Sequence, residues 1–251
     1  GANPRMPFPL TKRKFEAPFE LSILTEDFDQ TITASMASFP PRRERMIRVV
    51  QRILPQVDIL NIYLNDYEEV PEELIHDKIR VVLGKDGQGD LRDNGKFFFL
   101  DNLEQGYHIT IDDDIVYPPD YVQKLILKIE QYGRKAIVGV HGVLFDQPIE
   151  RFFLRRTVYG FYREHIRDAF VNLIGTGTLA YHTSTITLEF DSFTDHGMAD
   201  VFVAVQAKRD GVPIICMQRP KGWLESMDPD DEEETLWDEF QHADERQTAL
   251  V

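Results

Sequence analysis

Hydrophobic and polar residues alternate along TITASMAS, residues 31–38, and this period of two predicts a β-strand. The next segment, FPPRRERMIRVVQRILP, places apolar side chains at helical spacing between Pro40 and Pro41 at its start and Pro55 at its end. We therefore expect a strand, a loop and an amphipathic helix. The apolar positions of that helix are Met46, Val49, Val50, Ile53 and Leu54.

The alternation of strands and helices continues to about residue 145. The pattern predicts helices over roughly 95–104 and over PPDYVQKLILKIEQYG (118–133), where Gly133 is placed to end the helix. Strands are predicted for DILNIYLN (58–65), KIRVVL (78–83), YHITI (107–111) and AIVGVHGVLF (136–145).

The second half of the chain is less regular. We expect a strand and a glycine turn in VNLIGTGTLAYHTS (171–184), a helix from about Asp200, and a strand in VPIICM (212–217). Strands that alternate with amphipathic helices are typical of an α/β fold whose mostly parallel central sheet is flanked by helices. The predicted organisation is an extended N-terminal arm (1–30), one α/β domain with an elaborated C-terminal half (31–224), and an acidic tail with a terminal helix (225–251).

Composition supports a globular chain. Of its 251 residues, 42% are hydrophobic, which is enough for a sizeable core. The single cysteine, Cys216, lies in an apolar strand-like run, so we expect it to pack rather than react. No apolar run is long enough to cross a bilayer and no signal-peptide pattern is present, which predicts a soluble, cytoplasmic protein.

Negative charge is concentrated at the C-terminal end. The formal net charge is −15, and residues 225–251 contain eleven acidic residues against one basic residue, which leaves −10 in this short tail. The run DPDDEEE predicts either a solvated linker or the acidic first turn of a last helix that begins near Thr235. Overall acidity argues against nucleic acid as a partner, because duplex binding relies on Lys and Arg to neutralise phosphates.

Three consecutive aspartates, Asp112, Asp113 and Asp114, follow the strand predicted at 107–111. Adjacent carboxylates repel one another, so this arrangement favours a bound cation. Hard ions such as Mg2+ and Mn2+ are held by one or two carboxylates together with substrate phosphate oxygens. In open parallel sheets, ligands bind beyond the carboxyl ends of the strands, where these aspartates are predicted to lie. The alternative interpretation is a solvated acidic turn.

The ordered motifs of residues 31–224 resemble those of nucleotide-sugar-dependent glycosyltransferases of the GT-A fold, which is Rossmann-like. The resemblance is closest to bacterial transferases that build capsule or lipopolysaccharide glycans. A D-x-D element at a strand end, followed about ninety residues later by an acidic residue that opens a helix, is the most specific feature. The segments that carry the resemblance are ITASMASFPPR, RDNGKFFFLD, IDDDIVYPPDYV, LIGTGTLAYH and MADVFVAVQAKRDGVP.

The resemblance implies that a divalent cation, Mn2+ or Mg2+, bridges the D-x-D carboxylates and the diphosphate of the donor. Asp114 is then the expected direct metal ligand. Asp112 is expected to complete the metal shell or to bind the ribose. Asp113 points to the opposite side by strand alternation and is interpreted either as a contact to the donor sugar or as a structural residue.

Asp200 is the candidate general base that deprotonates the acceptor hydroxyl, as the acidic motif does in inverting members of the resembling family. The alternative role is structural, since aspartate is favoured at a helix start, where its side chain accepts backbone N–H bonds. The resemblance favours the role of general base for Asp200. Both roles are compatible only if one carboxylate oxygen stays free.

Further substrate-binding candidates each have a structural alternative. Lys96, with Asp93 and Asn94, is expected to hold the nucleobase or a phosphate, or else these residues form a solvated loop and helix start. Gly175 and Gly177 would allow the backbone to approach the donor sugar, or would form a plain tight turn. His141 and His182 each end a strand-like run and could face the cleft, although a lone histidine is more often a packing residue. The predicted substrate-binding residues are Ser35, Arg42, Asp93, Asn94, Lys96, Asp113, Gly177, His182 and Trp223.

One feature departs from the resembling family. Many members place a metal-binding histidine after the acidic motif, whereas this chain has none between Asp200 and His242. This departure favours the main alternative, a non-catalytic module that binds a nucleotide sugar or glycan on the same fold. An aspartate-nucleophile phosphatase is a weaker alternative, because DDDIVYPP lacks the threonine which that mechanism needs soon after the second aspartate.

The expected reaction is an inverting transfer of a sugar from a nucleotide-diphosphate donor, UDP-linked by preference, to a hydroxyl of a bacterial surface glycan or glycolipid. Direct attack by an activated hydroxyl needs one base and a stabilised leaving group. The basic aromatic stretch around Arg155, Arg156, Tyr159 and Tyr162 could face an anionic acceptor or the inner face of a membrane, or could be a packed helix. The terminal segments are also compatible with one module of a larger multidomain polymerase.

Overall fold

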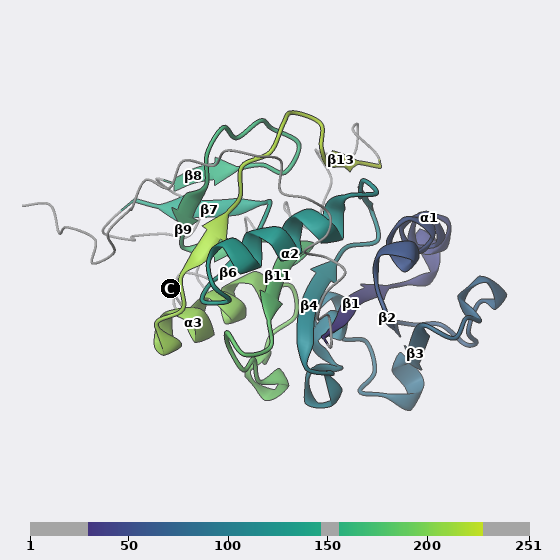
Figure 1. Ribbon diagram of the computed structural model, residues 1–251. Coiled ribbons are helices and arrows are strands. Elements are labelled where there is room, and N and C mark those ends of the chain that lie inside the picture. The colour runs from purple at the N-terminus through teal and green to yellow at the C-terminus, as the bar shows by residue number, and fades with distance from the viewer. Residues whose placement is uncertain (1–29, 147–155, 228–251) are drawn as a thin grey trace, which may run out of the picture.

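The computed structural model describes residues 30–146 and 156–227. An eight-stranded sheet in the order β3-β2-β1-β4-β11-β6-β12-β9 forms its centre (Figure 1). The sheet is mostly parallel, with β11 inserted antiparallel between β4 and β6 and with β9 antiparallel at one edge. Its strands are β1 (Thr31–Ser38), β2 (Ile59–Leu64), β3 (Ile79–Leu83), β4 (Gly106–Ile111), β6 (Ile137–Gly139), β9 (Ala169–Val171), β11 (Thr178–His182) and β12 (Ile214–Cys216).

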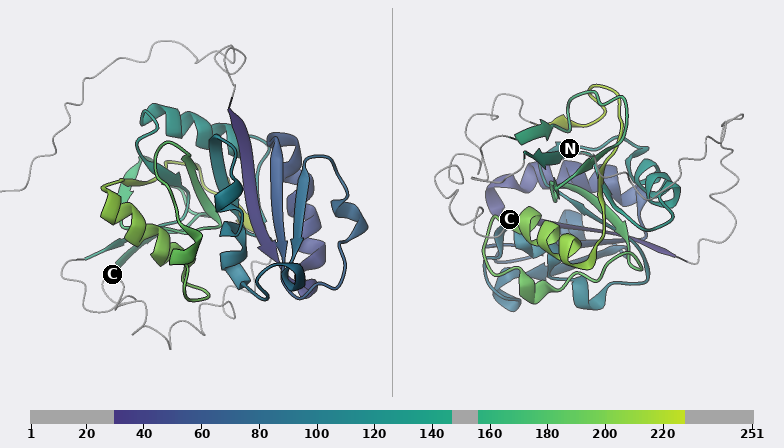
Figure 2. Two further views of the ribbon diagram at one scale, coloured as in Figure 1. Left: turned by 90° about the horizontal axis from the view of Figure 1, so that it is seen from below. Right: turned by 90° about the vertical axis from the view of Figure 1, so that its left-hand side faces the viewer.

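Helices cover both faces of the central sheet (Figure 2). Helix α1 (Arg43–Ile53) and helix α2 (Tyr121–Gln131) pack on one face, in an apolar cluster with Met36, Ile62 and Ile109. Helix α3 (Ala199–Asp210) packs on the opposite face, in a second cluster that includes Leu179. This arrangement confirms the predicted α/β class with a mostly parallel sheet flanked by helices.

Most predicted elements are present with small shifts of their ends. The two periodic helices run over α1 and α2, and α3 begins at Ala199, one residue before the predicted Asp200. Gly133 has a φ of 63°, the left-handed conformation predicted for the residue that ends α2. The strands predicted at 31–38, 58–65, 78–83, 107–111 and 212–217 are present as β1, β2, β3, β4 and β12.

The helix predicted over 95–104 is wrong. Instead of one continuous helix, the chain there forms two short 3-10 helices, Arg92–Phe97 and Leu100–Asn102. Gly95 packs so closely on the ring of Tyr63 that a Cβ would stand 2.7 Å from its Cδ1 atom. This close backbone approach, together with buried polar side chains that bond to distant segments, holds the segment in turns.

The single strand predicted over 136–145 is also wrong, because the chain changes sheets within it. β6 ends at Gly139 in the central sheet, and β7 (Gly142–Phe145) belongs to a three-stranded antiparallel sheet in the order β10-β7-β8. That sheet also contains β8 (Arg156–Tyr159) and β10 (Leu173–Ile174). A two-stranded sheet joins β5 (Ile115–Val116), directly after the aspartates, to β13 (Glu225–Ser226).

No helix in the described part of the chain is long and apolar enough to cross a membrane. The N-terminal arm, apart from residue 30, lies outside the described residues, and so does the acidic tail from 228 on, with the last helix predicted near Thr235.

Candidate active site

The aspartates lie at the carboxyl edge of the parallel strands, as predicted. Ser38 ends β1, and Asp112 follows Ile111 at the end of the neighbouring β4. β11 runs the opposite way and begins at this same edge, where Thr178 pairs with Ile111. The glycine turn that precedes Thr178 is thereby placed beside the aspartates.

Asp113 is held by the loop that follows β1. Its Oδ2 accepts a hydrogen bond from Ser38 Oγ at 2.6 Å, and its Oδ1 lies 2.8 Å from the Arg42 guanidinium. Asp113 is buried, and both of its carboxylate oxygens contact protein groups. It acts as an anchor for the β1 loop, which supports the structural alternative for this residue.

Asp114 shares Arg42 with Asp113, at 2.9 Å from its Oδ2 to the same guanidinium nitrogen. Burial and the negative charges of Asp112 and Asp113 raise the pKa of Asp114 to about 6, although Arg42 acts in the opposite direction. One guanidinium is therefore shared by two carboxylates, and its charge does not offset the effect of burial on Asp114.

Asp112 forms an ion pair with Lys96, whose side chain is only 3% exposed. Burial alone would lower the pKa of Lys96, but the negative charges of Asp112, Asp93 and Asp200 outweigh it and raise that pKa. The ammonium also lies 3.5 Å from Thr176 Oγ1, in the glycine turn. Lys96 is therefore a charged residue of the site rather than part of a solvated loop.

Because Gly177 has no side chain, the Asp112 carboxylate occupies the space beside it. A Cβ at Gly177 would stand 2.0 Å from Asp112 Oδ2 and 2.6 Å from its Cγ. The close approach predicted for this glycine is present, but its partner is a carboxylate of the protein.

Tyr117 is a functional candidate that the sequence patterns did not indicate. Its hydroxyl donates to the carbonyl of Gly177 at 2.6 Å and accepts the backbone N–H of Asp112 at 2.9 Å. The fully buried ring thus joins the glycine turn to the end of β4. The sequence signal for Tyr117 was weak, because a tyrosine in DDDIVYPP resembles an ordinary aromatic residue of the core.

Asp200 lies in the first turn of α3 and points to the glycine turn. Its Oδ1 accepts the backbone N–H of Thr176 at 2.8 Å, and no side-chain cap closes the start of the helix. Asp200 therefore does not cap the backbone N–H groups of α3, although as an acidic residue of the first turn it complements the helix dipole. Burial raises the pKa of Asp200 to about 6, against the lowering effects of Thr176 and Lys96.

The carboxylates around the turn outnumber the cations. Arg42 and Lys96 face five aspartates, and the raised pKa values of Asp114 and Asp200 follow from burial and from like charges nearby. Such a surplus suits one more cation, and Mg2+ is commonly held by one or two carboxylates plus substrate phosphates. No group of three or more His, Cys, Asp or Glu side chains within 30–146 and 156–227 could hold a metal without such help. The five aspartates are Asp93, Asp112, Asp113, Asp114 and Asp200.

Three predicted binding residues are held by internal contacts: Ser35 and Asn94 are buried, and Asp93 is half-buried. Ser35 is fully buried in β1, where its hydroxyl bonds to His108 and Asn61. Asp93 accepts the N–H of Gly197, and Asn94 donates to the carbonyls of residues 193 and 195. These contacts fix the loop that leads into α3, so Asp93 and Asn94 position Asp200 indirectly.

Two other predicted residues lie away from the aspartates. His182 ends the antiparallel β11 and pairs with Tyr107, four residues before Ile111, so it lies at the opposite edge of the sheet. Its imidazole bonds to Gln30 and Ser184. The placement of His182 in the cleft is therefore wrong, because β11 runs antiparallel, which its sequence alone does not reveal.

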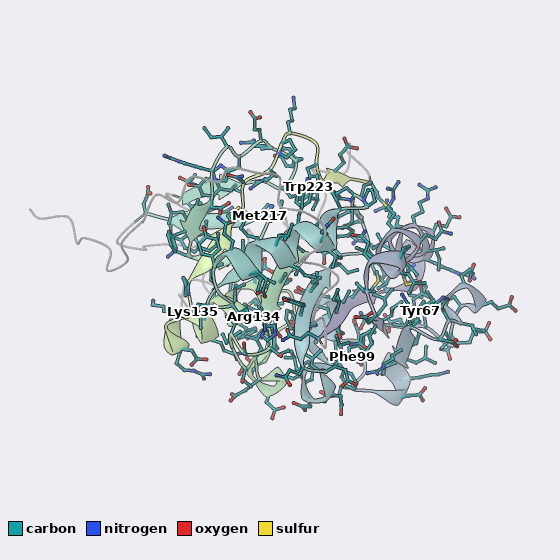
Figure 3. All side chains as sticks on the ribbon, in the orientation of Figure 1. Tyr67, Phe99, Arg134, Lys135, Met217 and Trp223 are labelled. Atoms are coloured by element: carbon teal, nitrogen blue, oxygen red, sulfur yellow. The ribbon has the colours of Figure 1, made fainter. Side chains whose placement is uncertain are left out.

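Trp223 lies beside α2, near Met217 (Figure 3). Its Nε1 donates to Asp120 at 3.0 Å, and the Lys124 ammonium lies 4.9 Å from its ring centroid. The tryptophan borders a groove of about 550 Å3 between α2 and the segments 164–166 and 217–220. This groove is not formed by any of the aspartates, so Trp223 is not brought to the candidate site.

We expect Asp200→Asn to raise the free energy of unfolding at pH 7 but not at pH 4. An aspartate pKa raised from about 3.9 to about 6 means that the folded state binds the proton more tightly than the unfolded state. The resulting stability is fully present below about pH 4 and is lost as pH rises through 6. Asparagine cannot ionise and keeps an oxygen for Thr176, so we expect a gain on the order of 1–2 kcal/mol at pH 7.

Urea unfolding at pH 4, 5, 6 and 7 measures this effect. Asp77→Asn, in an exposed turn, is the control and should change stability little at any of these pH values. An Asp200→Asn effect of equal size at pH 4 and pH 7 would contradict the assignment.

Comparison with known proteins adds information on the fold alone. No family model and no curated protein matches this chain. Among solved structures, a crystal structure described as that of a mycobacterial protein is similar to it, with a TM-score of 0.50 and 14% sequence identity. The similarity covers 74% of this chain and 65% of the other. The chain thus has a mixed α/β fold with a large, mostly parallel central sheet flanked by helices, compatible with a Rossmann-like fold.

Proposed function

We propose that this chain is a GT-A-type glycosyltransferase that moves a sugar from a nucleotide-diphosphate donor to a hydroxyl of a bacterial surface glycan or glycolipid. The observation that carries the proposal is the glycine turn 175–177, which touches Asp112 on one side and Asp200 on the other. The proposed cation ligand Asp112 and the half-buried Asp200, whose pKa is raised to about 6, thereby contact the same three-residue turn. UDP is the preferred nucleotide, by resemblance.

The leaving group of such a transfer is a nucleoside diphosphate, which gains negative charge as the glycosidic bond breaks. Asp112 and Asp114 would hold Mn2+ or Mg2+, and a bound divalent cation supplies direct stabilisation of that charge. Arg42 and Lys96 lie against the same aspartates and provide two fixed positive charges for the diphosphate oxygens. Because the Arg42 and Lys96 side chains already form ion pairs with the aspartates, they are held at the edge of the sheet.

Asp200 is the proposed general base. The acceptor hydroxyl transfers its proton to the carboxylate as the oxygen attacks the anomeric carbon, so the configuration at that carbon inverts. A pKa of about 6 suits this role, because the group is ionised at neutral pH yet basic enough to take a proton. The bond from Thr176 N–H to Oδ1 fixes the orientation of the carboxylate.

Substitution of Asp200 tests the proposal. The wild-type chain is first screened for thermal stabilisation and sugar release with UDP- and GDP-sugars, with and without Mn2+. Asp200→Asn should lower turnover by about 10²- to 10⁴-fold and leave the dissociation constant of the donor within about threefold. Asp77→Asn should preserve both. No shift and no turnover with any donor would remove the proposal.

A non-catalytic module that binds a nucleotide sugar is the second candidate. This candidate is supported by contacts that already occupy the carboxylates. Both oxygens of Asp113 contact Ser38 or Arg42, and Asp200 accepts a hydrogen bond from Thr176. Such a module would bind a donor but release no sugar, and Asp200→Asn would then have no turnover to reduce.

A further inference from the structure

The glycine turn also touches a histidine that has no role in the mechanism above. A Cβ at Gly175 would lie 3.4 Å from Cβ and from ring atom Cδ2 of His141. The backbone of the two segments is tied by two bonds, from Gly175 N–H to the His141 carbonyl at 2.8 Å and from His141 N–H to Thr178 Oγ1 at 3.0 Å. His141 and Asp112 therefore flank the same turn, one beside Gly175 and the other beside Gly177.

His141 lies where the chain leaves the central sheet, two residues after β6 ends and one before β7 begins. The residue is half-buried, with Phe161 at 6.0 Å between ring centroids. No hydrogen bond from its imidazole nitrogens to any residue within 30–146 and 156–227 is present. Since burial, with the positive charges of Arg219 and Arg156, lowers its pKa to about 4, the ring is neutral at pH 7 and offers one donor and one acceptor.

Strand order indicates which part of a donor would reach this imidazole. Arg42 and Lys96 belong to segments that follow or pack against β1 and β2, so the proposed diphosphate position lies toward that side of Asp112. β6 lies two strands beyond β4 in the other direction, about 10 Å away at the usual strand spacing. A donor laid across the edge from β1 toward β6 places its sugar over the glycine turn, between the diphosphate and His141.

We propose that His141 and the Gly175–Gly177 turn form the subsite for the donor sugar, with the neutral imidazole bonded to a sugar hydroxyl. This inference rests on the proposed function and adds His141, which is not among the nine predicted substrate-binding residues. Asp200, which bonds to the same turn, would then stand at the sugar rather than at the nucleotide. The competing role is packing alone, with the imidazole as a spacer between Gly175 and Phe161.

Paired titrations with and without the sugar separate these roles. The full chain is titrated by calorimetry, in the presence of Mn2+, with UDP-glucose, UDP-galactose, UDP-N-acetylglucosamine, GDP-mannose, UDP and GDP. His141→Ala should raise the dissociation constant of the best-bound sugar nucleotide about tenfold and leave that of its nucleoside diphosphate within about twofold. His141→Asn keeps an N–H donor and should restore part of the affinity. His182→Asn, at the opposite edge of the sheet, is the matched control and should change neither value.

Several outcomes would overturn the inference. An equal loss for the sugar nucleotide and the nucleoside diphosphate would show a packing role, and so would no loss for either. If His141→Ala unfolds at the titration temperature, the dissociation constants of the sugar nucleotide and the nucleoside diphosphate are compared for His141→Asn instead. A wild-type chain that binds none of the six probes removes the proposed function and this subsite together, whereas a wild-type chain that binds while His141 has no effect removes only the subsite.

Discussion

Gly177→Ala is expected to abolish donor binding and to lower the free energy of unfolding by about 2–3 kcal/mol. The added Cβ would stand 2.0 Å from Asp112 Oδ2, and on the other side the Gly177 carbonyl is bonded to the buried Tyr117, so the turn cannot move away freely. The carboxylate must leave, and Lys96 would then remain buried without its closest counter-charge. Urea unfolding measures the loss of stability, and calorimetric titration with UDP and UDP-sugars measures binding.

Gly175→Ala is the matched control, two residues away in the same turn. Its Cβ would meet His141 atoms at 3.4–3.5 Å, which is ordinary van der Waals contact. We expect a change in stability below about 1 kcal/mol and retained binding of the nucleoside diphosphate. Equal effects of the two alanines would contradict the role given to the space beside Asp112, because neither glycine has the left-handed φ that would require glycine.

Local patterns were sufficient where an element depends on its own residues. The period of two in β1, the apolar stripe of α1 and the left-handed Gly133 after α2 are properties of single segments, and all three were predicted correctly. The position of the aspartates at the carboxyl edge of the sheet also followed, because a strand that alternates with helices runs parallel to its neighbours and ends at the same edge.

Contacts between distant segments explain the incorrect predictions. A helix was predicted over 95–104, but Gly95 lies against Tyr63, which is 32 residues away in the sequence, and the segment bends into turns. The break at His141 depends on different partners, since Gly139 pairs with Leu179 and Gly142 with Tyr159. No pattern within residues 136–145 contains that information.

The candidate site was predicted in part for the same reason. Repulsion among three adjacent carboxylates indicates that positive charge is needed, but it does not indicate its source. Two protein cations supply part of it: Lys96, 16 residues before Asp112, and Arg42, 71 residues before Asp113. The sequence identified both as candidates for substrate binding, and the structure places both on the aspartates themselves.

A double-mutant cycle on Lys96 and Asp112 should show strong coupling. Asp112→Asn leaves the buried ammonium without its nearest carboxylate, and we expect it to cost about 2–3 kcal/mol. The value is set at the low end for buried pairs because the Asp112 side chain is 39% exposed and partly solvated. Lys96→Met removes the charge that needs compensation, so the double variant should be more stable than Asp112→Asn alone, with a coupling energy of about 1–2 kcal/mol.

Stability and binding should separate in this cycle, because the pair has two roles. The double variant recovers stability but lacks a proposed metal ligand and a diphosphate contact, so it should bind neither UDP nor a UDP-sugar in the presence of Mn2+. The ion pair Lys128–Asp168, also largely buried but formed between α2 and the segment before β9, is the control. Its double variant, Lys128→Met with Asp168→Asn, should show coupling in urea unfolding while donor binding is retained. Recovery of binding together with stability in the Lys96–Asp112 double variant would mean that the pair only supports the fold, and the cation and diphosphate would then have to be held elsewhere.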